Sequence, residues 1–417
     1  MPTIALKYGD EAIPLEFGDN FRVLGQPSSK RPLSDIEINE RLDEPIDSAM
    51  IEEVVGPGKT VLIVVPDATR QTAAGQIVNL LVRRLIANGS APHELRIIFA
   101  TGIHRKVRAD ERAEILTPFI ADRIKTLDHD PRDLVSLIKI GETSSGIPIE
   151  LNRALVEHDH VILVGGISYH YFAGFTGGRK LICPGLASSR TISGTHKLAF
   201  DCESLDRRNG VGTALLEGNA VHEAFVEAVE KIEPVFAINT IVDDRGQATD
   251  LFCGDWRTAH RAACDAFDAD HAVTINEKRE CVIVSCGGSP HDLNLIQAHK
   301  ALESSAHACR DGGTIVLLAK CSDGLGREDF VKWFEAANSR DLARDLCEKY
   351  QVNGQTAWSL LGKAERFRIK ILTDLDSRSA TKMRLEKIDA ALVQNLINDA
   401  RSGYVLPLGA KTRIVMG

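Results

Sequence analysis

Short runs of β-branched residues alternate with longer amphipathic segments along the chain. Residues 61–65 form a continuous apolar run, as expected of a strand that is buried on both faces of a sheet. Residues 76–88 then place apolar side chains at helical spacing, with Gly89 just beyond them, and a second apolar run follows at 95–100. This alternation is typical of βα units around a largely parallel sheet.

The same alternation continues through most of the chain. Further strands are predicted at 161–164, 281–285 and 314–319, a hairpin at 235–242 and 247–252, and helices at 109–116, 256–269, 295–309 and 386–400. Residues 165–218 are rich in glycine and too irregular for regular elements, and a connection far longer than about 4 to 6 residues is usually functional. We predict an α/β protein of two domains, residues 1–270 and 271–417. Each has a largely parallel sheet flanked by helices, with a cleft between the domains.

Composition and charge narrow the classes of function. The 44% of hydrophobic and 26% of charged residues are close to the average of globular proteins. Fifty Lys and Arg against 58 Asp and Glu give a formal charge of −8, without a basic block, so nucleic acid is not an expected partner. There is no leader-like start and no run of about 18 apolar residues, which predicts a cytoplasmic protein without a membrane partner. The nine cysteines contain no C-x-x-C pair and are expected as reduced, mostly buried thiols.

Polar residues that could carry chemistry follow the predicted strands. In an open α/β sheet, ligands bind at the carboxyl ends of the strands, where loop amides and helix N-termini converge. The clusters at these ends are Asp67-Ala68-Thr69-Arg70, Thr101 to Arg105 with His104, the loop with His170, Gly177-Gly178-Arg179-Lys180 and His196, and Ser289 to Asn294 followed by Gln297 and Lys300.

Each cluster also has a simpler interpretation. Asp67 or Thr69 is of the type that caps a helix after a strand, and Asn294 and its neighbour Asp292 could do the same. His104 could be a solvated loop histidine. The Gly-Gly-Arg-Lys segment could be a flexible turn, since the sequence has neither a P-loop nor a dinucleotide fingerprint. However, three histidines and two lysines at successive strand ends are hard to explain by capping alone.

These residue types limit the chemistry. Two histidines across a cleft can exchange proton roles near neutral pH, and a third is available for a metal. A lysine in a glycine-rich loop is either a phosphate partner or a point of covalent attachment. The residues alone therefore indicate a small anionic substrate and acid–base histidines. A non-redox protein that binds a nucleotide or phosphate through the same loops is the alternative, and an NAD-dependent dehydrogenase would need the missing fingerprint.

In this order, the clusters resemble those of the lactate racemase family, the nickel-pincer-dependent 2-hydroxy-acid racemases and epimerases. The resemblance covers most of the chain. It rests on the four clusters together with the ten-residue step from His170 to Lys180 and the sixteen-residue step from Lys180 to His196.

The resemblance implies a cofactor and the residues that bind it. The cofactor of the family is a mononucleotide derived from nicotinic acid, whose pyridinium ring holds nickel through one carbon and two sulfurs. Lys180 would carry it as a thioamide, and His196 would complete a planar four-coordinate site, a geometry that suits Ni(II). His104 and His170 would be the acid–base pair. One takes the hydroxyl proton while the C2 hydrogen moves as hydride to the cofactor. After hydride returns to either face, the matching histidine reprotonates the oxygen.

The resemblance also implies how the substrate is held. The turn Asp67 to Arg70, expected at a helix N-terminus, would hold the cofactor phosphate or assist the substrate, with Arg70 among the substrate contacts. Gln297 and Lys300 share one helix face and would bind the substrate carboxylate. Lactate-handling members have an aromatic residue where this chain has Ile296, so the expected 2-hydroxy acids extend to malate and aldonates. The expected partners are this substrate and, transiently, the proteins that synthesise the cofactor.

Overall fold

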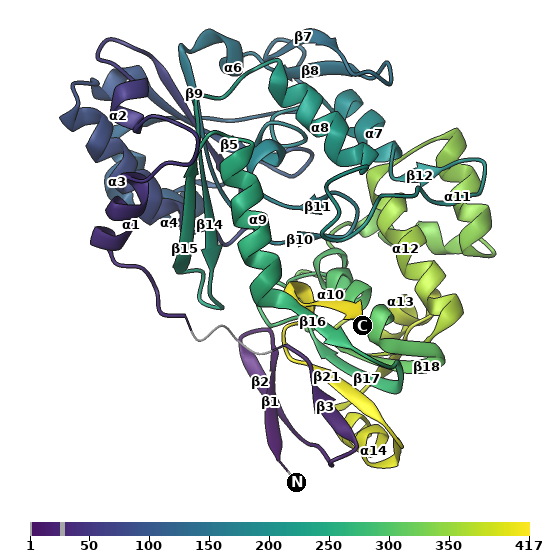
Figure 1. The fold of residues 1–417 in the computed structure, drawn as a ribbon. Coiled ribbons are helices and arrows are strands. Elements are labelled where there is room, and N and C mark those ends of the chain that lie inside the picture. The colour runs from purple at the N-terminus through teal and green to yellow at the C-terminus, as the bar shows by residue number, and fades with distance from the viewer. Residues whose placement is uncertain (1, 26–29) are drawn as a thin grey trace. The chain divides into compact units, whose positions relative to one another are not determined.

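The protein divides into two compact units. The computed structural model describes residues 2–25 and 30–417 (Figure 1). Unit 1 contains Phe200–Arg208, Asp268–Gly417 and the described part of Met1–Ser28. Unit 2 contains the described part of Ser29–Ala199 together with Asn209–Phe267. No helix in the described part of the chain combines the length and the apolar character needed to cross a membrane.

Unit 2 is built on a sheet of six described strands in the order β15-β14-β9-β4-β5-β6. These strands are β4 (Val61–Pro66), β5 (Leu95–Ala100), β6 (Lys125–Leu127), β9 (His160–Gly166), β14 (Phe236–Val242) and β15 (Ala248–Gly254). Neighbouring strands are parallel, except that β14 and β15 form the predicted antiparallel hairpin. The chain order reverses between β4 and β9, and ligands bind at such switch points of open sheets.

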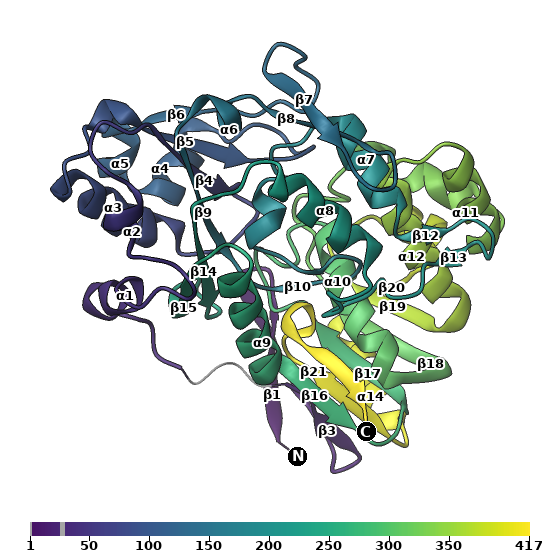
Figure 2. The same ribbon diagram turned by 45° about the horizontal axis from the view of Figure 1, so that its top comes forward.

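Helices cover both faces of this sheet (Figures 1 and 2). They are α1 (Asp35–Leu42), α2 (Ile51–Val54), α3 (Ala74–Ala87), α4 (Ala109–Leu116), α5 (Pro118–Arg123), α6 (Ala154–Glu157), α7 (Ser189–Lys197), α8 (Ala220–Glu230) and α9 (Thr258–His271). Every residue of β4 is buried, because both of its faces are covered. The stripe of Ile77 and Leu81 on α3 packs against Ile63 and Val65 of β4. The predicted strands 61–65, 95–100 and 161–164 are confirmed.

Unit 1 contains a second sheet of six described strands, ordered β20-β19-β18-β17-β21-β3, with every neighbouring pair parallel. Its strands are β3 (Phe21–Val23), β17 (Arg279–Ser285), β18 (Cys309–Leu318), β19 (Arg368–Leu372), β20 (Glu386–Ile388) and β21 (Gly403–Leu406). Its helices include α10 (Leu295–Ala308), α11 (Ser339–Glu348), α12 (Val352–Arg366), α13 (Ser377–Lys382) and α14 (Ala390–Asp399). The expected fold class, α/β with largely parallel sheets flanked by helices, is confirmed.

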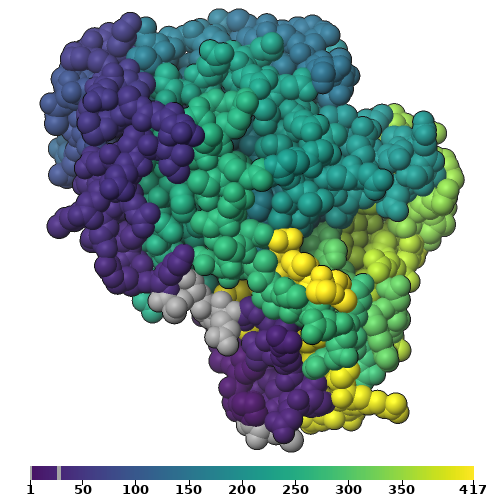
Figure 3. Space-filling view, in the orientation of Figure 1, coloured from purple at the N-terminus to yellow at the C-terminus, as the bar shows by residue number. Residues whose placement is uncertain are grey.

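The division into units differs from the predicted domains 1–270 and 271–417 in two segments. The N-terminal residues join unit 1, because β3 pairs with β21 and the hairpin of β1 (Thr3–Tyr8) and β2 (Glu11–Glu16) packs on the same core. Figure 3 shows their purple atoms beside the yellow C-terminal ones. Phe200–Arg208 also joins unit 1, where Phe200 packs edge-on against Trp358 at 4.7 Å between ring centroids.

Two element predictions were wrong in part. The stretch 165–218 was expected to lack regular elements, yet it contains α7, a helix that begins where the Ser188 hydroxyl accepts the Thr191 N–H. Its single buried stripe is rich in threonine, so the apolar periodicity that normally predicts a helix is weak. The helix predicted at 386–400 begins only with α14 at Ala390, after the strand β20.

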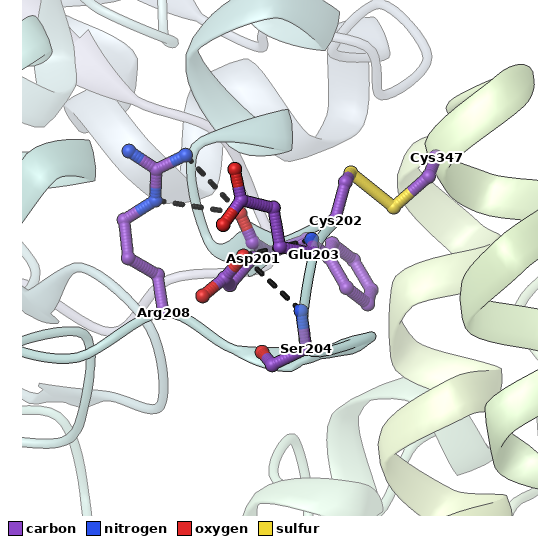
Figure 4. The surroundings of a disulfide bond; sticks show 7 residues. Asp201, Cys202, Glu203, Ser204, Arg208 and Cys347 are labelled. Carbon is purple, nitrogen blue, oxygen red and sulfur yellow. Dashed lines mark hydrogen bonds between the residues drawn. A yellow bond between two sulfur atoms is a disulfide. The ribbon is translucent and has the colours of Figure 1, made fainter.

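One cysteine pair departs from the expectation of reduced thiols. Cys202 and Cys347 of α11 form a disulfide with a Cα–Cα distance of 5.7 Å (Figure 4). Beside it, the Asp201 carboxylate accepts the backbone N–H groups of Glu203 and Ser204. The partners lie 145 positions apart in the sequence, so no local spacing indicates the pairing. In the described part of the chain, the other seven cysteines are buried and form no disulfide, as expected.

Candidate active site

The strand ends of unit 2 bring the predicted residues to one edge of its sheet. Asp67 directly follows β4, His104 lies four residues after β5, and His170 lies four residues after β9. Because these strands are parallel neighbours, their carboxyl ends share an edge. The turn of His104 also contacts the segment after Lys180, since the Gly102 N–H donates to the Gly185 carbonyl at 2.8 Å.

Asp67 and His104 form a hydrogen-bonded pair. The His104 Nδ1 lies 2.6 Å from the Asp67 Oδ2, while Thr69 donates its backbone N–H and its hydroxyl to Oδ1. Burial alone would raise the pKa of Asp67, but the bond and charge of His104, with Arg70 and Thr69, lower it to about 2. An ionised carboxylate accepts the proton on Nδ1, so the Nε2 of His104 carries the lone pair. The His104 side chain is 41% exposed and can meet a substrate.

The simpler interpretation of Asp67 and Thr69 as helix caps was wrong. Helix α3 begins at Ala74, and its N-cap is Ala73, which has a left-handed conformation (φ 52°) and makes no side-chain cap bond. The sequence suggested that the turn from Asp67 to Arg70 lies at a helix N-terminus. The structure shows that it lies before the start of α3. An anion bound there would meet the N–H groups and side chains of the turn, without the dipole of α3.

The segment Gly177 to Lys180 has a defined conformation, unlike the flexible turn of its simpler interpretation. Residues Gly178–Leu181 form a 3-10 helix, and Gly177 and Gly178 have φ values of 74° and 46°, which favour glycine. A Cβ on Gly178 would lie 2.6 Å from the Cδ2 of His260. The Gly178 N–H donates to the Asn239 Oδ1 at 3.1 Å. Both glycines are thus required by conformation and close approach.

Three predicted side chains converge on two phenylalanine rings. The Lys180 Nζ lies 5.8 Å from the ring centroid of Phe172 and 5.4 Å from that of Phe225. The His196 ring lies 5.0 Å and 5.7 Å from the same two centroids, and His170 lies 4.4 Å from Phe172. The sequence analysis missed both rings. Phe172 is close to His170 in sequence, but nothing in the sequence indicates Phe225, which comes from α8.

His196 has the surroundings of a metal ligand. It is 5% exposed, and within residues 2–25 and 30–417 its Nδ1 forms no hydrogen bond of good geometry, although the Ile192 backbone interacts with the ring. Burial and the charge of Lys180 lower its pKa to about 3, so the imidazole stays neutral, the state that binds metals. Among the described residues, no group of three His, Cys, Asp or Glu side chains could hold a metal ion.

The hydrogen bonds of His170 define its tautomer. Its Nδ1 accepts the Ala173 N–H at 3.2 Å, within the short hairpin of β10 (Tyr169–His170) and β11 (Gly174–Phe175). The neutral ring therefore carries its proton on Nε2, which can donate a hydrogen bond. His104 holds its proton on Nδ1, so the two predicted acid–base residues have complementary tautomers.

In unit 1, the predicted substrate residues lie on α10. Lys300 donates to the Gln297 Oε1 at 2.7 Å, which confirms that they share one face. Asn294 is the N-cap of α10, as its simpler interpretation proposed, and accepts the Gln297 N–H. Asp292 is not a cap, because its Oδ2 accepts the backbone N–H groups of Gly9 and Lys320.

Comparison with known proteins identifies the family. The family model of the lactate racemase N-terminal domain matches residues 8–206, and that of the lactate racemase C-terminal domain matches residues 275–388. The lactate racemase of Lactiplantibacillus plantarum is 32% identical over 345 residues, which cover 79% of this chain and 77% of that protein. The chain belongs to the lactate racemase family. It is therefore an isomerase of the racemase type, as the sequence resemblance implied.

A second lactate racemase and two solved structures are also similar to this chain. The lactate racemase of Thermoanaerobacterium thermosaccharolyticum is 29% identical over 357 residues, which cover 84% of this chain and 82% of that protein. The structure of the apoprotein from this organism superposes with a TM-score of 0.88 at 25% identity and covers 99% of this chain and all of that one (100%). A Thermotoga maritima protein shares the fold at 20% identity, with a TM-score of 0.73 over 94% of this chain and 100% of that one.

Proposed function

We propose that this member of the lactate racemase family inverts C2 of a 2-hydroxy acid with the help of a nickel-pincer nucleotide attached to Lys180. The observation that carries the proposal is the convergence of Lys180, His196 and His170 on the rings of Phe172 and Phe225. The reaction class is supported by the relatives, which are named lactate racemase.

The surroundings of Lys180 and His196 fit such a group. His196 offers a buried, neutral imidazole, and the amine of Lys180 approaches the same aromatic rings. When bound, the group would be held by Lys180 and His196 and would supply the means of accepting and returning a hydride. The turn from Asp67 through Ala68 and Thr69 to Arg70 is the proposed contact for its phosphate.

His104 and His170 move the hydroxyl proton of the substrate. His104 takes the proton at Nε2, because its Nδ1–H is bound to Asp67, whose carboxylate stabilises the resulting imidazolium. His170 donates a proton from Nε2 in the imidazolium state, which needs a second proton on Nδ1 and therefore the release of the bond from the Ala173 N–H. In the reverse direction the roles exchange, and the neutral ring with its proton on Nδ1 accepts the hydroxyl proton at Nε2.

The carboxylate of the substrate is assigned to Gln297 and Lys300, with Arg70 as a further contact. An amide and an ammonium group on one helix face can bind both oxygens of a carboxylate. Ile296 packs with its side chain half-buried against the core of unit 1 and has no hydroxyl to offer a substrate. The proposed substrates therefore include malate and aldonates beside lactate.

The proposal includes a cellular setting. We place the reaction in the cytoplasm, where the proteins that synthesise the cofactor act on this chain transiently. Neither nucleic acid nor a membrane takes part.

Expression together with those synthesis proteins tests the proposal. The purified protein should carry added mass on Lys180 and nickel, and it should interconvert the enantiomers of at least one acid in a panel of 2-hydroxy acids, measured by a chiral assay. The matched control is the same chain expressed without the synthesis proteins, which should be inactive on every acid.

Isotope labelling at C2 tests the hydride route. Deuterium at C2 should remain in the product through many turnovers, because the hydrogen returns from the same enzyme-bound group. Exchange with solvent water at the rate of turnover would contradict hydride transfer. A purified protein that carries neither an added cofactor mass on Lys180 nor nickel would favour the alternative, which is a non-redox protein that binds a nucleotide or phosphate.

A further inference from the structure

A buried arginine lies next to Lys180 in the sequence and has no part in the proposed chemistry. Arg179 is 1% exposed. Its Nε–H donates to the His222 Nδ1 at 2.9 Å. The terminal nitrogen Nη1 lies 2.9 Å from the His260 Nε2 and 3.4 Å from the Thr176 carbonyl. The terminal nitrogen Nη2 donates to the Ala173 carbonyl at 2.6 Å. Among the described residues, no carboxylate forms an ion pair with Arg179.

A buried guanidinium without a carboxylate is costly unless its N–H groups find acceptors. One of these acceptors is the His222 imidazole, which can accept only when it is neutral. The His260 Nε2 lies 2.9 Å from the Arg179 nitrogen and 2.9 Å from the Thr176 carbonyl, so it accepts from Arg179 only in the tautomer that does not donate to Thr176. Burial, followed by the charge of Arg179, lowers the pKa of His222 to about 3 and that of His260 well below its usual value. The bond from Nε–H also defines the tautomer of His222, which has its lone pair on Nδ1 and its proton on Nε2.

The acceptors of Arg179 come from three parts of unit 2. Ala173 and Thr176 precede the turn of Lys180, His222 lies on α8, and His260 lies on α9. The guanidinium therefore joins the turn to two helices that are far from it in sequence. Close packing supports this link, because a Cβ at Gly178 would overlap the ring of His260.

We propose that Arg179 is a positioning residue for Lys180. Its guanidinium, bound by His222 and the Ala173 carbonyl and in contact with His260, fixes the turn so that the amine of Lys180 is directed to Phe172 and Phe225. The claim that the placement of the Lys180 amine governs covalent attachment of the cofactor rests on the proposed function. The claim that Arg179 maintains the conformation of the turn is independent of that function.

The conformation of the turn is measured in the unloaded protein by deuterium exchange of the peptide that spans 173–185. Arg179→Lys keeps the charge, but its compact ammonium group cannot span the separate acceptors that the planar guanidinium reaches. His222→Leu keeps the approximate volume but removes the acceptor. Both should speed exchange of the turn amides about tenfold or more, because a hydrogen bond to a charged group is lost. His222→Asn should restore slow exchange, because its amide oxygen can replace Nδ1.

The matched control is Arg84→Lys. Arg84 of α3 is also a mostly buried arginine of unit 2, but it pairs with Glu52 and Asp43. Its variant should exchange like wild type in 173–185. Wild-type exchange of this peptide in both Arg179→Lys and His222→Leu would overturn the proposal, and so would a His222 that NMR finds protonated on Nδ1 at pH 6.

Loading with cofactor is measured on the same variants after expression with the synthesis proteins. Mass on Lys180 should fall about fivefold or more in Arg179→Lys and His222→Leu and return in His222→Asn, because each change alters one charge-assisted hydrogen bond. Full loading of the first two variants would overturn the positioning role. A wild-type chain that never loads would instead contradict the proposed function, and the exchange experiment would still decide the role of Arg179.

Discussion

Replacing Asp67 by asparagine removes the charge that holds His104 and keeps the shape of the side chain. The pKa of Asp67 is lowered from 3.8 to about 2, although burial opposes this. At about 1.4 kcal/mol for each pKa unit, this shift corresponds to about 2.5 kcal/mol, and His104 makes the largest favourable contribution. Proton transfer at His104 should therefore slow by up to about 60-fold from the lost charge alone.

A second effect of Asp67→Asn is on the tautomer of His104. The asparagine NH₂ group can donate to Nδ1, which moves the ring proton to Nε2 and removes the base from the substrate side. In a triad with the same Asp–His geometry, this kind of exchange costs about 10⁴ in kcat. We expect kcat to fall by a factor of about 10² to 10⁴. KM should change little, because Asp67 does not bind the substrate carboxylate in the proposed mechanism.

The assay compares loaded enzymes of equal nickel content in both directions of racemisation. Asp159→Asn is the matched control, because the pKa of Asp159 is also lowered to about 2, through Thr60, but Asp159 lies at the opposite end of the sheet, just before β9. It should keep wild-type kcat. A loaded Asp67→Asn enzyme with kcat within about threefold of wild type would refute the role of this pair, since the reasoning requires a loss of at least about 10².

The stability of the same variant should depend on pH in a defined direction. A carboxylate with a lowered pKa stabilises the folded state above its unfolded pKa, and this contribution disappears as pH falls toward the folded value. Urea unfolding should show that Asp67→Asn is less stable than wild type by up to about 2.5 kcal/mol at pH 6. The difference should shrink from about pH 5 toward pH 2. A difference that grows on acidification would contradict the assigned charge state.

Four further outcomes are expected. Lys180→Ala should lose both the added mass and the nickel, whereas His196→Ala should keep the mass and lose nickel, as intact mass and metal analysis will show. His170→Ala should keep the cofactor but stop turnover in both directions of the chiral assay. Gln297→Ala should raise KM more than it lowers kcat, because it removes a contact to an unreacting group. Cys202→Ser should lower the free energy of unfolding by up to about 5 kcal/mol without reductant and by nothing with reductant, since the disulfide spans 145 positions.

The edge of the sheet that carries the site could be predicted from the sequence. Buried parallel strands are continuous apolar runs, and the runs at 61–65 and 95–100 are directly followed by the polar groups of Asp67 and His104. A strand end is a local property of the sequence, and the sheet then brings separate strand ends together. For this reason, residues in three distant segments could be assigned to one edge without knowledge of the strand order.

Contacts that depend on tertiary packing could not be predicted. Phe225 reaches the site from the middle of α8, where a phenylalanine has the pattern of an ordinary core residue. The segment Phe200–Arg208 joins unit 1 through an aromatic contact and a disulfide, and its partners are more than a hundred residues away. Helix α7 was missed because its buried stripe contains threonines, which have no clear apolar signal.

The histidines of unit 2 show why residue type alone does not define a role. His104 faces a carboxylate and is partly exposed, so it can gain and lose a proton. His196 is buried beside an ammonium group, which keeps it neutral and leaves a nitrogen for a metal. His222 is buried against a guanidinium and accepts a hydrogen bond in the neutral state. The sequence indicated His104 from its place after a predicted strand, and His196 from the glycine-rich stretch after the next one, although His196 lies on α7. It gave no sign of the third, because His222 lies on a helix and acquires its role only through a long-range contact with a buried charge.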